Sequence, residues 1–278
     1  NVRLGNTSSS TDRTITLASG SFIEVRNLLD LIGNSGRNMA VSGGRIEVSG
    51  DVKVDEEDYT CAVWLVGTNH QTLTGRGGLI VTFHVNKTNG TVSLDGTTQF
   101  RTFNVWQGDL DPGTSTVIFL AAQTSVTGQF TLARLEIGNA TTSTERDLDL
   151  LGDTVITVTN HLSYNGPSSI NKIANVDGGR FLLTGDLTVV SNGTAYAYGT
   201  TWHVFTGTAV QVISAPRAPN RFGFPIRIDK ADGEVRLDTD FSMSVAGKSL
   251  VFTNGTLNLG EQSRLTLSGA NAYFSNAS

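Results

Sequence analysis

The stretch GGRIEVSGD at residues 43–51 returns as GGRFLLTGD at residues 178–186, which is 135 positions later. VNKTNGTVSL at 85–94 returns in the same way as IDKADGEVRL at 228–237, 143 positions later. The matches keep their order along the chain, and the offset drifts as it would after small insertions. Collinear matches at one long period indicate a tandem duplication.

A third match sets the limits of the two copies. GNTSSSTDR at 5–13 corresponds to GNATTSTER at 138–146, 133 positions later. We therefore expect a first repeat unit at 1–137 and a second at 138–275, and each unit resembles two diverged half-units. Residues 276–278 resemble the opening of a further unit, because NAS repeats the NAT of 139–141.

The local pattern predicts strands throughout. Apolar and polar residues alternate at 13–17, 45–48, 154–158 and 264–267, as they do in strands with one buried face. Asn-Gly or Asp-Gly pairs supply the positive φ of tight turns. These pairs lie at 89–90, 95–96, 165–166, 192–193, 232–233 and 254–255.

Short strands at such intervals suit a β-solenoid or tandem β-sandwich domains. Repeats that stay collinear while varying in length favour the solenoid, because a stacked coil accommodates insertions by enlarging one loop. The sequence therefore predicts an all-β, parallel β-helix or β-solenoid-like repeat rod. Tandem β-sandwich domains are the alternative.

The composition excludes several classes of protein. Charged residues are 16% of the 278 residues, against about 25% in average soluble domains. The net charge is −5 and no Lys/Arg cluster is dense enough to follow a phosphate backbone, so nucleic acid is not an expected partner. No apolar run reaches the length of a membrane-spanning helix. The single cysteine, Cys61, lies in an apolar run and is expected to be a small buried side chain.

Four phrases resemble the repeat regions of giant secreted bacterial cell-surface proteins of the adhesin type. They are DPGTSTVIF at 111–119, FTLARLEI at 130–137, PIRIDKADGEVRL at 225–237 and LVFTNGTLNLG at 250–260. The resemblance covers most of residues 100–278 and, through the duplication, the rest of the chain. It implies a secreted, β-helix-like stalk, and it supplies no catalytic residues.

The histidines do not suggest a metal site or a nucleophile. His70, His84, His161 and His203 are far apart in sequence and form no HxxxH or HExxH arrangement. Alternation places His84 and His203 at outward-facing strand positions. No GxSxG elbow or phosphate-binding glycine loop is present in the sequence, so no catalytic, cofactor-binding or metal residues are predicted.

Three pairs of aspartates are spaced i, i+2, which puts both carboxylates on one face of a strand. Such a pair can bind Ca²⁺ or act as acid and base in glycoside cleavage. Exposed strand ends are the preferred interpretation, because the second unit does not repeat the first pair. Ca²⁺ remains a weak candidate and no other cofactor is expected. The pairs are Asp109 with Asp111, Asp147 with Asp149, and Asp238 with Asp240.

Two surface features are weaker candidates for sites. Tyr196, Tyr198 and Trp106 have rings that stack well on sugars, although large rings more often fill cores. Asn-x-Ser/Thr triplets mark Asn86, Asn139, Asn192 and Asn254 as candidate glycosylation sites, but a chain rich in these residues contains such triplets by chance.

Taken together, the sequence predicts a structural or adhesive repeat segment of an extracellular surface stalk or filament, without enzymatic activity. Its expected partners are neighbouring repeats, copies of itself and surface glycans. The alternative from another class is a carbohydrate-binding or carbohydrate-active β-helix module.

Overall fold

The computed structural model describes the chain except residues 6–12, 34–37, 56–57, 139–144, 167–171, 192–195, 216–220, 246–247, 262, 269–272 and 277–278. Side chains at 13, 38–39, 58, 172, 191, 196, 221, 248–249 and 273–276 are also outside the description. The described part is 78% strand and contains no helix. Its strands pair in parallel, as they do at β3–β6, β6–β8 and β13–β16. The β-solenoid prediction is confirmed, because β-sandwiches are built from antiparallel strands.

The chain divides into two compact units. Unit 1 comprises residues 1–119 and 124–133, and unit 2 comprises residues 120–123 and 134–278. Unit 1 holds β1 (Val2–Gly5), β2 (Arg13–Thr16), β3 (Phe22–Val25), β4 (Leu28–Ile32), β5 (Asn38–Ser42), β6 (Arg45–Val48), β7 (Asp51–Val54), β8 (Asp58–Leu65), β9 (Gln71–Asp111) and β10 (Thr116–Phe119).

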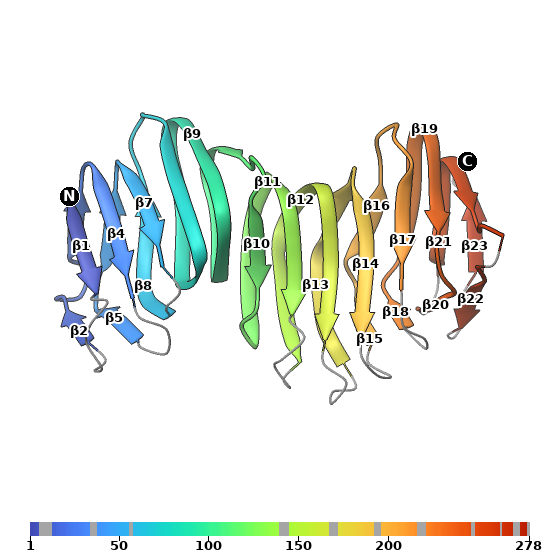
Figure 1. Cartoon of the computed structure of the whole chain (residues 1–278), viewed down its shortest axis with the longest axis horizontal. Helices are drawn as coiled ribbons and strands as arrows, with labels where there is room; N and C mark the ends of the chain where they lie inside the picture. Colours follow the sequence, from blue (N-terminus) through green and yellow to red (C-terminus); the bar gives the residue numbers. More distant parts are fainter. Residues whose placement is uncertain are drawn as a thin grey trace. The chain divides into compact units, whose positions relative to one another are not determined.

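Strand β11 (Gln123–Gly138) contributes residues to both units. Unit 2 continues with β12 (Arg146–Gly166), β13 (Lys172–Leu183), β14 (Asp186–Ser191), β15 (Tyr196–Gly199), β16 (Trp202–Phe205), β17 (Gln211–Ser214), β18 (Arg221–Gly223), β19 (Ile226–Leu237), β20 (Phe241–Ser244), β21 (Lys248–Asn258), β22 (Leu265–Ser268) and β23 (Tyr273–Asn276). Within each unit the strands lie side by side and turn at corners (Figure 1).

The core of unit 1 is a stack of inward-facing side chains, one from each coil. Val25 pairs in register with Val48, Val48 with Leu65, and Leu65 with Val85. Each of these side chains is at most 1% exposed. Burying one such side chain contributes about 1.5–3 kcal/mol, so every coil is stabilised mainly by its neighbours.

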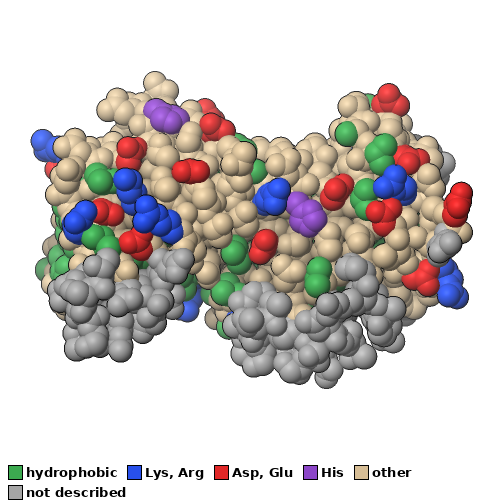
Figure 2. Space-filling view, viewed as in Figure 1, with side chains coloured by type: hydrophobic (Ala, Val, Ile, Leu, Met, Phe, Trp, Pro, Cys, Tyr) green, Lys and Arg blue, Asp and Glu red, His purple; other side chains and the backbone are tan. Residues whose placement is uncertain are grey.

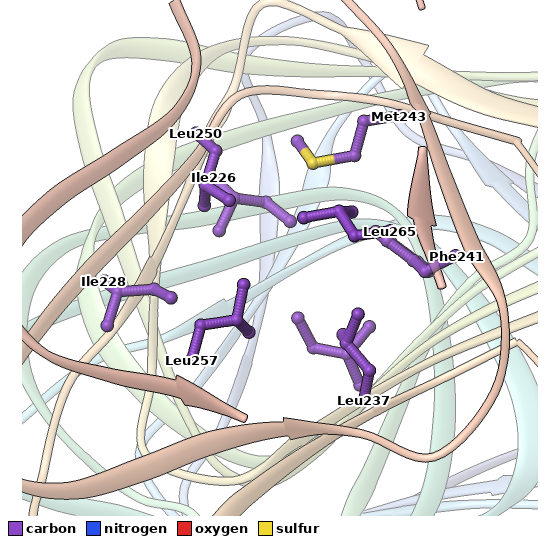
Figure 3. A pocket seen from close by; sticks show the side chains of 9 residues that line it. Ile226, Ile228, Leu237, Phe241, Met243, Leu250, Leu257 and Leu265 are labelled. Carbon is purple, nitrogen blue, oxygen red and sulfur yellow. The ribbon is translucent and has the colours of Figure 1, made fainter. Parts of the chain in front are cut away.

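Unit 2 repeats this arrangement with larger side chains. Val158 pairs with Leu183, Leu183 with Phe205, and Phe205 with Ile228, and all are fully buried. Figure 3 shows further apolar side chains that converge from β19 to β22 on one small void. This void measures only ≈ 10 Å³, which leaves room for about one water molecule at most. The interior at this point is therefore packed core.

Glycine corners connect the strands. Gly90 and Gly233 hold equivalent places in the two repeated phrases, and each has φ +76°. A Cβ atom would lie 2.5 Å from Thr68 O at Gly90 and 2.3 Å from Thr208 O at Gly233. The Asn-Gly and Asp-Gly pairs at these places thus form corners between parallel strands, which require both the positive φ and the missing side chain.

One corner of unit 1 contains a buried polar column, which we call the corner column. Gln71 Nε2 donates to Val48 O at 2.9 Å and to Gly50 O at 2.5 Å. Lys87 Nζ in turn donates to Gln71 Oε1 at 2.5 Å and to Asn69 O at 2.7 Å. Both side chains are fully buried, so these bonds link three successive coils in the absence of solvent.

Unit 2 contains the same column. Gln211 Nε2 donates to Leu183 O and Gly185 O, both at 2.8 Å. Lys230 Nζ donates to Gln211 Oε1 at 2.6 Å and to Ala209 O at 2.7 Å. Equivalent residues in two units that differ at most positions therefore make the same buried contacts.

Glycines close the column on both sides. A Cβ at Gly185 would lie 2.1 Å from Asn160 O, and one at Gly50 would lie 1.8 Å from Asn27 O. A Cβ at Gly108 or Gly255 would meet the Cβ of Lys87 or Lys230 at 2.9 Å. The coils can approach this closely only because glycine occupies these corners.

We expect Gly185→Ala to destabilise the protein by about 3 kcal/mol, because the new methyl group would overlap the Asn160 backbone, which has little room to move. Urea unfolding followed by circular dichroism measures the change. Gly152→Ala is the control: Gly152 has φ +60° but open space around its Cβ position, so only backbone strain of about 1 kcal/mol is expected. Equal losses in the two variants would contradict the steric explanation.

Candidate functional site

The outer face of unit 1 carries a group of large side chains, one from each of several successive coils. Phe22 belongs to β3, Arg45 to β6 and Trp64 to β8, while His84 and Trp106 belong to separate coils of β9. Alternation sends Val25, Ile46 and Val63 to the core, and it therefore sends these five residues outward. We call Phe22, Arg45, Trp64, His84 and Trp106 the aromatic cluster.

The members of the aromatic cluster are in direct contact. The Trp64 and Trp106 rings meet edge to face, with centroids 4.9 Å apart. The His84 ring lies 4.8 Å from Trp64 and 4.5 Å from Trp106. The Arg45 guanidinium lies over Trp64 at 4.7 Å and over Phe22 at 5.5 Å, which are cation–π distances.

The charges around the aromatic cluster are compensated locally. Arg45 forms an ion pair of 2.6 Å with Glu47, and Arg26 forms one of 2.8 Å with Glu24. His84 accepts a hydrogen bond of 3.2 Å at Nδ1 from Asn104 Nδ2. Burial lowers the pKa of His84 to about 4, so its ring is neutral at pH 7. The cluster together with Glu47 thus presents aromatic surface with no net charge.

Unit 2 has a different feature, a shallow polar depression of ≈ 300 Å³. Its lining comes from β11, β12 and β14. Burial lowers the pKa of His161, and the nearby Asp186 opposes this shift. The lining residues are Arg134, Glu136, His161, Ser163, Asn165, Thr188 and Val190.

The polar depression does not contain a hydrolytic relay among its described residues. Asp186 pairs in register with His161, but its Oδ1 accepts from Val212 N at 2.8 Å. Ser163 Oγ accepts from Asn165 Nδ2 at 3.4 Å. The depression can therefore offer hydrogen bonds to a small polar molecule.

Charges of both signs are mixed on the face shown in Figure 2, where neither sign forms a continuous patch. Several basic side chains are paired with acids, as in Arg3–Asp30 at 2.9 Å and Arg236–Asp238 at 2.9 Å. A surface of this kind has no basic stripe of the sort that nucleic-acid-binding proteins present.

The predicted outward position of His203 is wrong. His203 is fully buried, its Nε2 lies 2.7 Å from the Tyr164 hydroxyl, and its Nδ1 lies 3.2 Å from Thr201 O. In β16 it is Trp202 that faces outward, where Arg227 covers its ring at 5.0 Å. The side chains alternate between the two faces as expected, but in the opposite sense. Arg227 stabilises the Trp202 ring on the outer face, and the Tyr164 hydroxyl forms a hydrogen bond with the His203 ring in the core. His84 faces away from the core as expected, but it is not a surface imidazole, because Trp64 and Trp106 pack against it and leave it only 8% exposed.

The three residues predicted to stack on glycans have different environments. Trp106 is half-exposed and belongs to the aromatic cluster. Tyr198 lies in unit 2, where its hydroxyl donates to Glu145 Oε1 at 2.5 Å. The side chain of Tyr196 lies outside the described residues. The structure therefore brings together Trp106, Trp64 and His84 in place of Trp106 and the tyrosines.

A signal for the aromatic cluster was present in the sequence. Its successive members are 19–23 positions apart, which is about one coil, since Val25 pairs with Val48 and Leu65 with Val85. Aromatic rings recur at this period at Trp64, His84 and Trp106. That period only becomes visible once the pairing register is known.

Three of the aspartates that the sequence analysis grouped in pairs interact with nearby residues of the chain. Asp111 accepts from Gly113 N and from Ser93 Oγ, both at 3.2 Å. Asp238 pairs with Arg236, and Asp240 accepts from Arg264 N at 2.8 Å. Among the described residues there is no group of three or more side chains placed to hold a metal ion.

The remaining sequence candidates are placed as follows. Asn86 is half-buried in β9, and Asn254 is exposed with its Nδ2 3.2 Å from Asp229 Oδ1. Asn139 and Asn192 lie outside the described residues. Cys61 is buried as predicted, and burial raises the pKa of its thiol to about 12.

Within the described ranges, no helix is long and apolar enough to cross a membrane. No family model, curated protein or solved structure matches this chain, so the fold and the two surface features are the basis on which its function has to be inferred.

Proposed function

We propose that this chain is a structural and adhesive repeat segment of an extracellular surface stalk or filament. In this role the chain acts as a spacer that keeps its binding surfaces at a fixed distance from the cell. A spacer requires stacked coils and no chemical step. The low charge content and the outward Thr, Ser and Asn side chains suit a secreted β protein of this kind.

The recurrence of the corner column is the observation that carries this proposal. The hydrogen bonds of Gln71 and Lys87 return at Gln211 and Lys230 with the same atoms. An enzyme needs one site in one place, whereas these contacts serve only to stack coils and are present in both units. Repetition of a stacking device is what a scaffold requires.

Stacking also explains how burial varies between coils. Phe241 and Met243 are at most 2% exposed, while their register partners Leu265 and Leu267 in β22 are only half-buried. Strand β22 is described with a register partner, β20, on one side, so a further coil stacked on its other side would bury these two side chains. Added coils should therefore add stability.

Tandem copies test this proposal. We expect two or three copies of the chain, joined end to end, to unfold in urea at a higher midpoint than one copy, because more coils then have two neighbours. Circular dichroism gives the midpoint. A midpoint that does not change with copy number would show a self-contained domain and contradict the scaffold role. The control joins the copies through a long proline-rich linker, a semi-rigid spacer that holds their ends too far apart to stack.

A second candidate function is a carbohydrate-binding or carbohydrate-active β-helix module. The half-exposed Trp106 in the aromatic cluster favours the binding role, since an exposed ring in contact with other rings is a ready surface for a sugar. The catalytic role has weaker support, because Asp111, Asp238 and Asp240 are engaged locally. Polysaccharide turnover that disappears in Asp109→Asn or Asp149→Asn would contradict the non-enzymatic proposal.

A further inference from the structure

We propose that the aromatic cluster of unit 1 binds an uncharged glycan chain, with sugar rings stacked on Trp106 and Phe22. This inference rests on the adhesive part of the proposed function and names its ligand class. The aromatic residues at the outer ends of the cluster provide the contact surface, and those between them hold it in place.

Exposure selects the two contact residues. Trp106 is 50% exposed and Phe22 is 51% exposed. They are two of five large hydrophobic residues that are exposed in the described part of the chain, the others being Leu151, Val210 and Leu259. An aromatic ring that remains half in water is available to a ligand, and its π-face attracts the C–H groups on the apolar side of a sugar ring.

The rings are fixed before a ligand arrives. Trp106 packs against Trp64 and His84, and the Arg45 guanidinium lies over the Trp64 ring. Asn104 holds the His84 ring by its hydrogen bond to Nδ1. Since these side chains have little freedom to lose on binding, a weak stacking contact is not offset by a large entropic cost.

The charges indicate an uncharged ligand. The two arginines near the cluster are each paired with a glutamate, Arg45 with Glu47 and Arg26 with Glu24. An anionic polysaccharide would have to separate these pairs, and it would also meet Glu24 and Glu47, which face each other in register. For a neutral sugar the same carboxylates and guanidinium groups are useful, because they accept from and donate to hydroxyls.

The size and spacing of the surface suit a glycan better than a protein. A stable protein interface buries about 800 Å² on each partner around an apolar centre, and two separate exposed rings do not supply that. The cluster members follow one another from coil to coil, so the backbones of Phe22 and Trp106 lie four strand spacings apart, roughly 19 Å, and the side-chain contacts between them bring the two rings closer than that. An extended oligosaccharide of a few rings can cover that distance.

The test measures binding of the whole chain to soluble neutral glycans by calorimetry and by tryptophan fluorescence. The probes are a β-glucan, a mannan and a galactan, with polygalacturonate as the anionic comparison. We expect at least one neutral glycan to bind and to change the fluorescence. We expect Trp106→Ala to weaken that binding by about tenfold or more, the usual scale for a lost stacking residue.

Trp202→Ala is the matched control. Trp202 also faces outward on a strand, but it lies in unit 2 and is covered by Arg227. Its replacement should leave the affinity unchanged, and unchanged urea midpoints would show that both variants are folded. The proposal is overturned if no neutral glycan binds, if polygalacturonate binds more tightly, or if Trp106→Ala binds like the original chain.

These outcomes are separate from those of the scaffold test. Tandem copies can gain stability when no glycan binds, in which case the scaffold role survives and this inference fails. Conversely, if the chain binds a glycan but its urea midpoint does not change with copy number, the glycan inference survives and the scaffold role fails.

Discussion

Replacing Gln211 with alanine is expected to lower the free energy of unfolding by about 3–5 kcal/mol. The change removes the acceptor of Lys230 Nζ and the donor to Leu183 O and Gly185 O, all in a buried corner. The Lys230 ammonium group loses a partner, and the Leu183 and Gly185 carbonyls lose a donor. Each loss lowers the stability, because water cannot replace the missing bonds in a buried corner. Urea unfolding followed by circular dichroism measures the loss.

A double variant measures how strongly Gln211 and Lys230 depend on each other for stability. Gln211→Leu with Lys230→Met replaces the whole polar pair by apolar side chains of similar size. We expect the double variant to lose less free energy of unfolding than Gln211→Leu and Lys230→Met lose separately when added together, by about 1 kcal/mol or more. Gln71 and Lys87 should respond in the same way in unit 1. Lys53→Ala, at an exposed position, should have almost no effect. Additive losses at Gln211 and Lys230 would show that the corner column is not a coupled unit.

Lowering the pH should destabilise the protein through His203. Burial lowers the pKa of His203 to about 3, against 6.5 for a solvated histidine, and its hydrogen bond to Thr201 O opposes this only in part. Between these values the unfolded chain binds a proton that the folded chain does not bind. The stabilising effect of the neutral ring is therefore complete above pH 6.5 and is lost as the pH falls towards 3, at about 1.4 kcal/mol per pH unit.

The measurement is the free energy of unfolding in urea from pH 7 to pH 4. His203→Gln should lower the stability at pH 7, because the contact with the Tyr164 hydroxyl changes, but its pH dependence should be shallower by the slope of one proton. His84, whose pKa is also lowered by burial, continues to titrate in that variant. Parallel curves for His203→Gln and the original chain would contradict this account.

Much of the architecture was predictable because it depends on local rules. Alternation at 45–48 gave a strand with one buried face, and the glycines at 90 and 233 gave corners. The repeated phrases favoured stacked coils over sandwiches, since repetition of variable length needs a fold that tolerates loops of different size.

The candidate site was only partly predictable. Trp106 was identified as a ring that can stack on a sugar, but it was grouped with Tyr196 and Tyr198, which lie in unit 2. Its actual neighbours, Trp64 and His84, come from preceding coils. A neighbour one coil away is set by the length of every loop in between, and no local pattern contains that information.

The sequence by itself determined that this chain consists of short strands joined at glycines, because the alternation of side chains and the positive φ of glycine act over a few residues. That the strands pair in parallel was decided by the tertiary structure, since the sequence left tandem sandwiches as the alternative. The tertiary structure alone decided that His203 faces inward and Trp202 outward, and that Gln71 meets Lys87 in a buried corner. The physical reason is that partners in a solenoid are about one coil apart. A buried imidazole or ammonium group is stable only where another coil supplies its hydrogen-bond partner.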